Sequence, residues 1–204
     1  MGSPSSMRAA LLLSGGMDSI ALAHWKKPGL AIHINYGQRA ASGERRAARA
    51  VCDSLDIPLE SVNVDCSELG SGDMAGAPPL AMAPLREWWP YRNQLLITLG
   101  SMKIIGRGYH KIMIGTVKDD ASHSDGSARF VQIISDLQSY QEGGIEVDAP
   151  ALSLSTAELI KAAAVPIELL AWSHSCHVGP VACGNCGGCA KHFRVMQELG
   201  HEPY

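Results

Sequence analysis

The sequence predicts an α/β fold, namely a doubly wound, five-stranded and mostly parallel sheet followed by a small cysteine-rich C-terminal knuckle. Short apolar runs alternate with helix-like stretches, and this alternation is typical of right-handed βαβ units. The hydrophobic fraction of 46% and the charged fraction of 18% exclude a disordered or coiled-coil chain. A length of 204 residues predicts one domain with a small appendage, since domains average ~150 residues.

The first half of the chain supplies three of the expected strands. Each is a short apolar run bounded by turn residues, and an amphipathic stretch separates each from the next. The expected strands are residues 9–13, 30–35 and 59–64, and the expected helices are residues 18–26 and 43–55.

The second half is interrupted by residues 65–90, which are rich in glycine and proline and have no sustained period. A loop of this length is unusual unless it covers a site or moves, and its Trp88–Trp89 pair is expected to be exposed as an interface or a lid. Ser155 and Glu158 form a capping box that starts a helix ending near Pro166. The remaining expected elements are helices 93–105, 127–138 and 190–199, a fourth strand at 111–114 and a fifth at 167–172.

Charge and hydropathy restrict the partners and the compartment. Seventeen Lys and Arg against twenty Asp and Glu give a net charge of −3, so nucleic acid is not the expected partner. No apolar run approaches the ~20 residues that cross a bilayer, and no signal peptide is recognised. Clustered rather than dispersed cysteines favour a cytoplasmic protein. Met1–Ser6 resemble a cloning remnant, with Met7 as a plausible natural start.

Residues 14–19, with the sequence Ser-Gly-Gly-Met-Asp-Ser, lie between the first expected strand and its helix. The glycines let the backbone approach an anion closely, while the helix N-terminus offers unpaired N–H groups and a partial positive charge. An ordinary capped turn is the alternative interpretation. The string lacks the Gly-Lys-Ser/Thr of a Walker motif, so a different kind of phosphate site is expected.

Four of the six cysteines, Cys176, Cys183, Cys186 and Cys189, lie within one short glycine-rich stretch. Their thiolates can close a tetrahedral Zn²⁺ site that stabilises the end of the chain. An iron–sulfur cluster is the alternative, although no Cys-x3-Cys-Pro completes that pattern. His174 and His177 are alternative ligands to Cys176. The separate Cys52 and Cys66 are expected to pack in the core.

Together these motifs resemble those of the 7-cyano-7-deazaguanine synthases, a QueC-like family of PP-loop ATP pyrophosphatases. Residues 14–19 resemble the pyrophosphate loop of that superfamily, and Cys-x2-Cys-x2-Cys resembles the family's zinc knuckle. Three further stretches match in order. They are Tyr36-Gly37-Gln38-Arg39, Pro90-Tyr91-Arg92-Asn93, and Ile114-Gly115 with Asp120. On the residues alone, Tyr36-Gly37 could be a simple turn and Arg92-Asn93 a helix start.

The resemblance implies an adenine nucleotide alpha hydrolase-like domain over residues 7–172 and a zinc knuckle with a C-terminal helix over residues 173–204. It implies an enzyme that uses ATP, with Mg²⁺ as a helper, to adenylate the carboxylate of 7-carboxy-7-deazaguanine. Ammonia then gives an amide, and a second activation gives the nitrile. The implied catalytic residues are Asp18, Arg39, Arg92, Asp120 and Asp125, and the implied nucleotide-binding residues are Ser14, Gly15, Gly16, Asp18, Ser19, Ile34, Tyr36 and Gly115.

The chain departs from the family at two places. His123–Ser127 replace a Tyr-Pro-Asp-Cys-Arg string, of which only Asp125 survives, and Thr156 replaces a lysine. Lost cations weaken the stabilisation of phosphate charge unless Lys118, Arg129 or Lys161 substitutes. The pattern also fits a variant, associated with antiviral defence, that joins the activated deazaguanine to an amine of a partner protein.

Two other classes of function stay open at this point. A related pyrophosphatase that modifies tRNA would need a basic face, which the net charge of −3 disfavours. A degenerate binding module would bind ATP without turnover, and the changes at positions 123–127 and 156 favour it. The sequence does not identify the acceptor amine or an oligomeric state, and a homo-oligomer or a partner protein is compatible with it.

Overall fold

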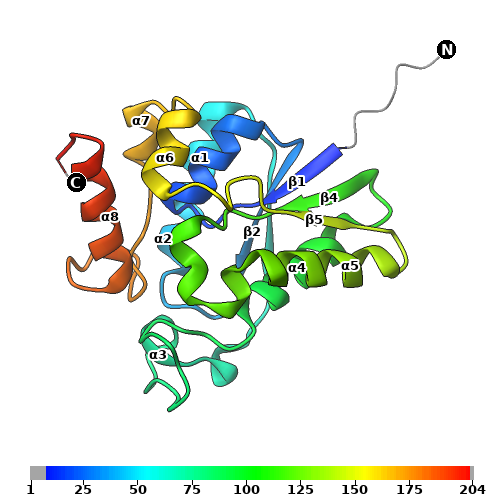
Figure 1. The fold of residues 1–204 in the computed structure, drawn as a ribbon, viewed down its shortest axis with the longest axis horizontal. Coiled ribbons are helices and arrows are strands. Elements are labelled where there is room, and N and C mark those ends of the chain that lie inside the picture. The colour runs from blue at the N-terminus through cyan, green and yellow to red at the C-terminus, as the bar shows by residue number, and fades with distance from the viewer. Residues whose placement is uncertain (1–7, 203–204) are drawn as a thin grey trace.

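Five parallel strands form a single sheet in the computed structural model, which describes residues 8–202 (Figure 1). Their order is β3-β2-β1-β4-β5, and every neighbouring pair is parallel. The strands are β1 (Arg8–Leu12), β2 (Leu30–Asn35), β3 (Leu59–Asn63), β4 (Tyr109–Met113) and β5 (Glu146–Asp148). The predicted doubly wound fold is confirmed. The expectation for Met1–Ser6 and Met7 falls outside the described residues.

Helices follow the strands as expected for βαβ units. The longer ones are α1 (Met17–Lys26), α2 (Ala41–Leu55), α4 (Arg92–Ile104), α5 (Ala128–Tyr140), α6 (Thr156–Ala162) and α8 (Gly187–Glu198). The capping box before α6 is confirmed, because Ser155 Oγ accepts from the Glu158 amide at 3.2 Å and Glu158 Oε2 accepts from the Ser155 amide at 2.8 Å. Within residues 8–202, no helix is long and apolar enough to cross a membrane.

The predicted position of the fifth strand is wrong. Residues 167–172 contain the short helix α7 (Ile167–Leu170), which begins directly after Pro166. Proline fixes a φ suited to a helix start, and the apolar run buries Leu169 and Leu170 on one side of that helix. The true edge strand, β5, has three residues of which only Val147 is buried, so it has little hydrophobic pattern.

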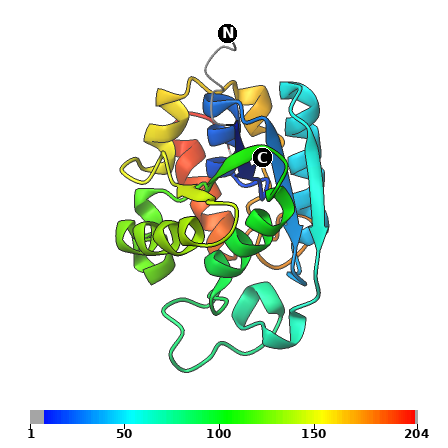
Figure 2. The same ribbon diagram turned by 90° about the vertical axis from the view of Figure 1, so that its right-hand side faces the viewer.

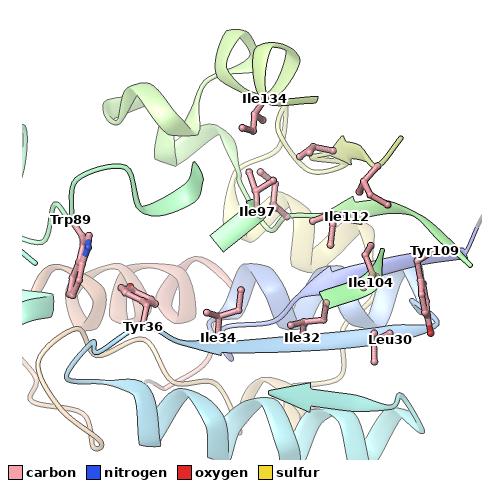
Figure 3. Packing of buried hydrophobic residues seen from close by; sticks show 14 of the residues in the cluster. Leu30, Ile32, Ile34, Tyr36, Trp89, Ile97, Ile104, Tyr109, Ile112 and Ile134 are labelled. Carbon is pink, nitrogen blue, oxygen red and sulfur yellow. The ribbon is translucent and has the colours of Figure 1, made fainter. Parts of the chain in front are cut away.

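Alternating side chains of the central strands build a core on each face of the sheet. Ala10 of β1 packs with Ile32 and Ile97 on the face covered by α4 and α5, as Figure 3 shows for the labelled part of this cluster. Leu11 packs with Ile20 on the opposite face, under α1 and α2. Figure 2 shows these helices on both sides of the sheet. This period of two is characteristic of a strand buried on both faces.

The long segment between β3 and α4 contains a 3-10 turn, η1 (Ser67–Leu69), and one short helix, α3 (Gly72–Ala75). The expectation that Trp88–Trp89 is exposed is wrong for Trp89, which is 3% exposed and meets the Tyr36 ring edge to face at 4.8 Å. Trp88 is partly buried. The indole therefore attaches this segment to the end of β2.

Glu60 on β3 provides a pH-dependent contribution to stability. Its carboxylate binds Arg107 at 2.6 Å and Lys103 at 3.0 Å, and these hydrogen bonds lower its pKa from 4.5 to about 2. A lowered pKa stabilises the fold above pH 4.5, and that stability is lost as the pH falls through about 2. We expect Glu60→Gln to reduce the free energy of unfolding by up to ~1 kcal/mol at pH 6 and by nothing near pH 2.

Urea unfolding of both proteins at several pH values measures this difference. Glu142→Gln is the matched control, because Glu142 is exposed and makes no ion pair among residues 8–202. A Glu60→Gln penalty that did not change with pH would contradict an electrostatic origin.

Candidate active site

A cavity of about 460 Å³ lies at the carboxyl ends of β1 and β4. In this strand order the chain reverses its direction across the sheet between these two strands. Ligands of open α/β sheets bind in the crevice at such a switch point. Residues 14–19 after β1 and residues 114–120 after β4 both contribute to the lining of the cavity.

The glycine loop between β1 and α1 presents the start of a ten-residue helix to this cavity. Gly16 is the N-cap, and no side chain caps the first-turn amides. Ser14 Oγ lies 3.2 Å from Ser19 Oγ, and Ser19 Oγ donates to the Gly16 carbonyl at 2.9 Å. Two hydroxyls and free amide groups thus surround the helix N-terminus, an arrangement that suits an anion.

Gly15 shapes this loop without lining the cavity. Its φ is +84°, and a Cβ at this position would lie 2.7 Å from both Ala47 Cβ and the Glu44 carbonyl oxygen of α2. We expect Gly15→Ala to destabilise the protein by ~2 kcal/mol or more, because backbone strain and a clash add together. Urea denaturation measures the loss.

Gly108→Ala is the matched control for Gly15→Ala. Its φ of +76° is similar, but nothing lies within 4 Å of the added Cβ. This variant should therefore lose only the strain of a left-handed residue, ~1–2 kcal/mol. Equal losses in the two variants would show that the contact between the loop and α2 is not tight.

The structure brings most of the predicted site residues to the cavity. The predicted residues that line it are Ser14, Gly16, Asp18, Ser19, Ile34, Tyr36, Arg92, Gly115, Asp120 and Asp125. Arg39 does not line it: the side chain is exposed and lies next to Gly76 in the long segment. The geometry therefore does not support an anion-binding role for Arg39.

Arg92 and Asp125 lie on the side of the cavity formed by α4. Arg92 contacts Met74 Sδ at 3.2 Å and lies beside the buried Tyr36, whose pKa is raised by burial. Asp125 accepts from the Asn93 amide at 3.3 Å, and its carbonyl oxygen accepts from Asn93 Nδ2 at 2.9 Å. Asp125 thus caps the start of α4, which is a structural task for a residue expected to be catalytic.

A cation that no sequence motif indicated, Lys191 of α8, lies beside the glycine loop. Its Nζ lies 2.9 Å from Asp18 Oδ2 and 3.4 Å from Asp120 Oδ1. Burial lowers the pKa of Lys191, but the two carboxylates outweigh burial and raise it above 10.5. Lys118, Arg129 and Lys161, the expected substitutes, are exposed and do not line the cavity.

Two other cavity residues, both glutamates, were also missed, whereas His177 was expected only as an alternative ligand to Cys176. Glu44 of α2 and Glu87 of the long segment add acidic groups, and His177 lies beside the cysteine cluster. Burial lowers the pKa of His177. No motif marked the two glutamates, because Glu44 reaches the cavity from α2 and Glu87 from the long segment, through tertiary packing alone.

The four cysteines form one cluster next to the cavity. Their sulfur atoms lie within 4.8 Å of one another, with Cys183 Sγ 3.9 Å from Cys189 Sγ and Cys176 Sγ 4.0 Å from Cys186 Sγ. Zn–S bonds of ~2.3 Å in a tetrahedron place sulfur atoms ~3.8 Å apart. The donor set therefore fits Zn²⁺. Of the alternative ligands, His174 Nε2 instead contacts the Gly179 carbonyl at 3.0 Å.

Comparisons with known proteins agree with this geometry. The family model "Queuosine biosynthesis protein QueC" matches residues 8–200. A 7-cyano-7-deazaguanine synthase of Chloroherpeton thalassium is 32% identical over 215 residues, covering 95% of this chain and 94% of its own. The synthase of Methanosarcina mazei is 27% identical and covers 95% of both chains. NMN synthetase from Francisella tularensis has the same fold, with a TM-score of 0.52 and 14% identity over 97% of this chain and 79% of its own.

A parallel sheet, a glycine loop before the first helix and a charged cavity at the switch point define a PP-loop enzyme of the ATP-dependent ligase class. The family model that matches residues 8–200 identifies the family within that class. The chain belongs to the QueC family, whose curated relatives are 7-cyano-7-deazaguanine synthases.

Proposed function

We propose that this enzyme adenylates the carboxylate of 7-carboxy-7-deazaguanine with ATP and then forms a C–N bond at the activated carbon. A carboxylate oxygen attacks the α-phosphorus of ATP, and the bond to the departing pyrophosphate breaks. The amine nitrogen then attacks the acyl carbon, AMP leaves, and the amine loses a proton. The observation that carries the proposal is the pairing of an open helix N-terminus with Lys191 in one cavity.

The loop residues Ser14, Gly16 and Ser19 would hold the departing pyrophosphate through hydroxyl and amide donors. Ile34 and Tyr36, at the end of β2, would lie against the nucleotide, and Gly115 would allow a close approach. A Cβ at Gly115 would lie 3.1 Å from the Ser19 amide nitrogen, so a larger residue would push these two segments apart. Arg92 would bind an anionic group, as a guanidinium does in bidentate fashion.

Mg²⁺ would supply positive charge to the phosphates of ATP. The donor set supports this role, because Asp18 Oδ1 is buried without a well-formed hydrogen bond and Asp119 and Asp120 also line the cavity. Zn²⁺ would bind the four cysteines and stabilise residues 173–204 as a separate knuckle. The boundary after residue 172 and the cytoplasmic location stay predictions.

Mass spectrometry of products tests the proposal. Incubation with ATP, 7-carboxy-7-deazaguanine and ammonia should yield AMP, pyrophosphate and the amide, followed by the nitrile if the second activation occurs. ATP cleavage that no deazaguanine carboxylate stimulates would overturn it. ATP binding without any turnover would favour a degenerate binding module.

A second candidate function is transfer of the activated deazaguanine to an amine of a partner protein. The departures from the family's motifs at residues 123–127 and at Thr156 favour it. Asp125 caps α4, and Thr156 stands where the resemblance implies a lysine. The partner should then gain the mass of 7-carboxy-7-deazaguanine less one water, and this gain should require ATP. Equal products with ammonia alone and no labelled partner would exclude this variant.

A further inference from the structure

Lys191 reaches the glycine loop from a helix far along the chain. Its helix, α8, packs against α6, and its Nζ meets Asp18 in the first turn of α1. The side chain is 27% exposed and lines the cavity, so it is accessible to a ligand that enters there. It contacts the carboxylates of Asp18 and Asp120, which line the same cavity.

The cavity carries more acidic than basic groups. Six carboxylates line it, belonging to Asp18, Glu44, Glu87, Asp119, Asp120 and Asp125, whereas its Lys and Arg residues are Arg92, Lys191 and Arg194. The Arg92 guanidinium contacts Met74 Sδ, whereas Arg194 is exposed and pairs with Glu198 at 3.9 Å. Among the described lining residues, Lys191 is therefore the cation paired with an acid of the glycine-loop helix.

Position 156 faces the same carboxylate from a different helix. Thr156 is the first residue of α6 and is fully buried, and its hydroxyl lies near Asp18 without a well-formed hydrogen bond. Its amide donates to Asp119 Oδ2 at 3.4 Å. The side chains at positions 156 and 191 thus converge on Asp18.

We propose that Lys191 supplies the phosphate-neutralising cation of this active site and takes the place of the lysine that the resemblance implies at position 156. The proposal rests on the proposed function, and it assigns a catalytic task to a residue next to the cysteine cluster. As pyrophosphate departs, the ammonium group of Lys191 would move from Asp120 to a phosphate oxygen while Asp18 keeps it in position. Charge develops on that leaving group, so a cation placed there favours the transition state.

Binding of inorganic pyrophosphate with Mg²⁺, measured by calorimetry, tests the assignment without the acceptor substrate. Lys191→Gln should weaken the affinity by ~10-fold or more, since a charge-assisted hydrogen bond is lost. The double variant Lys191→Gln/Thr156→Lys should recover most of it, and pyrophosphate release from ATP should follow the same order. Lys161→Gln is the control, because Lys161 is exposed on α6 outside the cavity.

Three results would overturn the assignment. The first is wild-type affinity in folded Lys191→Gln, and the second is no recovery in a folded Lys191→Gln/Thr156→Lys variant. The third is wild-type affinity in Lys191→Gln/Asp120→Asn, which would mean that Lys191 only cancels the charge of Asp120. If the wild type binds pyrophosphate through Lys191 but no deazaguanine carboxylate stimulates ATP cleavage, the proposed substrate fails and the role of Lys191 stands.

Discussion

Asp18→Asn is expected to reduce pyrophosphate release by about 100-fold without unfolding the protein. Asp18 Oδ2 holds Lys191 Nζ at 2.9 Å, and an amide cannot position an ammonium group through the same charge. Misplacement of a catalytic group by ~1 Å is enough for a loss of this size. A coupled assay of pyrophosphate measures the rate in the presence of ATP and the carboxylate substrate.

The same substitution should leave the melting temperature unchanged or raise it. Burial, together with the neighbouring Asp120, raises the pKa of Asp18 above its usual 3.8, although Lys191 opposes this shift. A raised carboxyl pKa means that the ionised group opposes folding at neutral pH. The neutral amide removes that penalty, so activity and stability should change in opposite directions.

Asp136→Asn is the control for Asp18→Asn, because Asp136 is exposed on α5 and accepts from Gln132 at 2.8 Å. It should change neither the rate nor the melting temperature appreciably. Pyrophosphate release at the wild-type rate by Asp18→Asn would contradict the role of Asp18. A large fall in its melting temperature would show instead that the ion pair with Lys191 is mainly structural.

With Zn²⁺ at the four cysteines, as proposed, Cys186→Ser is expected to release the metal and to destabilise the C-terminal region. Cys186 is buried, is the N-cap of α8, and has its Sγ 4.0 Å from Cys176 Sγ. Loss of one thiolate from a four-thiolate Zn²⁺ site removes folding free energy directly, on the order of 4 kcal/mol or more. For a chain of this size that corresponds to a fall of ~10 °C in melting temperature.

Metal content by atomic emission and melting temperature by calorimetry are the two measurements for Cys186→Ser. The matched control is Cys66→Ser, since Cys66 is a free, partly buried cysteine outside the cluster. It should keep a full complement of metal. If Cys186→Ser also kept its metal, with unchanged stability, the four sulfur atoms would not form the site.

The sequence predicted the sheet and the loop because both depend on local patterns. The side chains of residues 30–35 alternate between two buried faces of the sheet, and this pattern predicts a strand. The two glycines at 15–16 stand between a strand and a helix, so the adjacent sequence predicts the loop. The edge strand β5 was missed because three residues with one buried valine give almost no pattern. A neighbouring apolar run at 167–170 gave a stronger but misleading signal.

The charged residues of the cavity were harder to predict, because they come from distant parts of the sequence. Lys191 lies 173 positions from Asp18 in the chain, and no spacing rule relates two helices that far apart. Lys118 and Lys161, which were expected to substitute for a lost cation, have exposed side chains outside the cavity. Arg39 belongs to a matched motif, yet its side chain is exposed and lies beside Gly76 instead of in the cavity.

One backbone contact has a consequence for how the enzyme matures. The His174 amide donates to the Gly15 carbonyl at 2.8 Å, so the region before the cysteines is attached directly to the loop near the start of the chain. Lys191 and Arg194 complete the wall of the cavity from the same end. During synthesis on the ribosome, the earlier strands can pair before this end emerges, but the pocket stays open on one side until it does. Incomplete translation products would therefore be inactive toward ATP even where their sheet has formed.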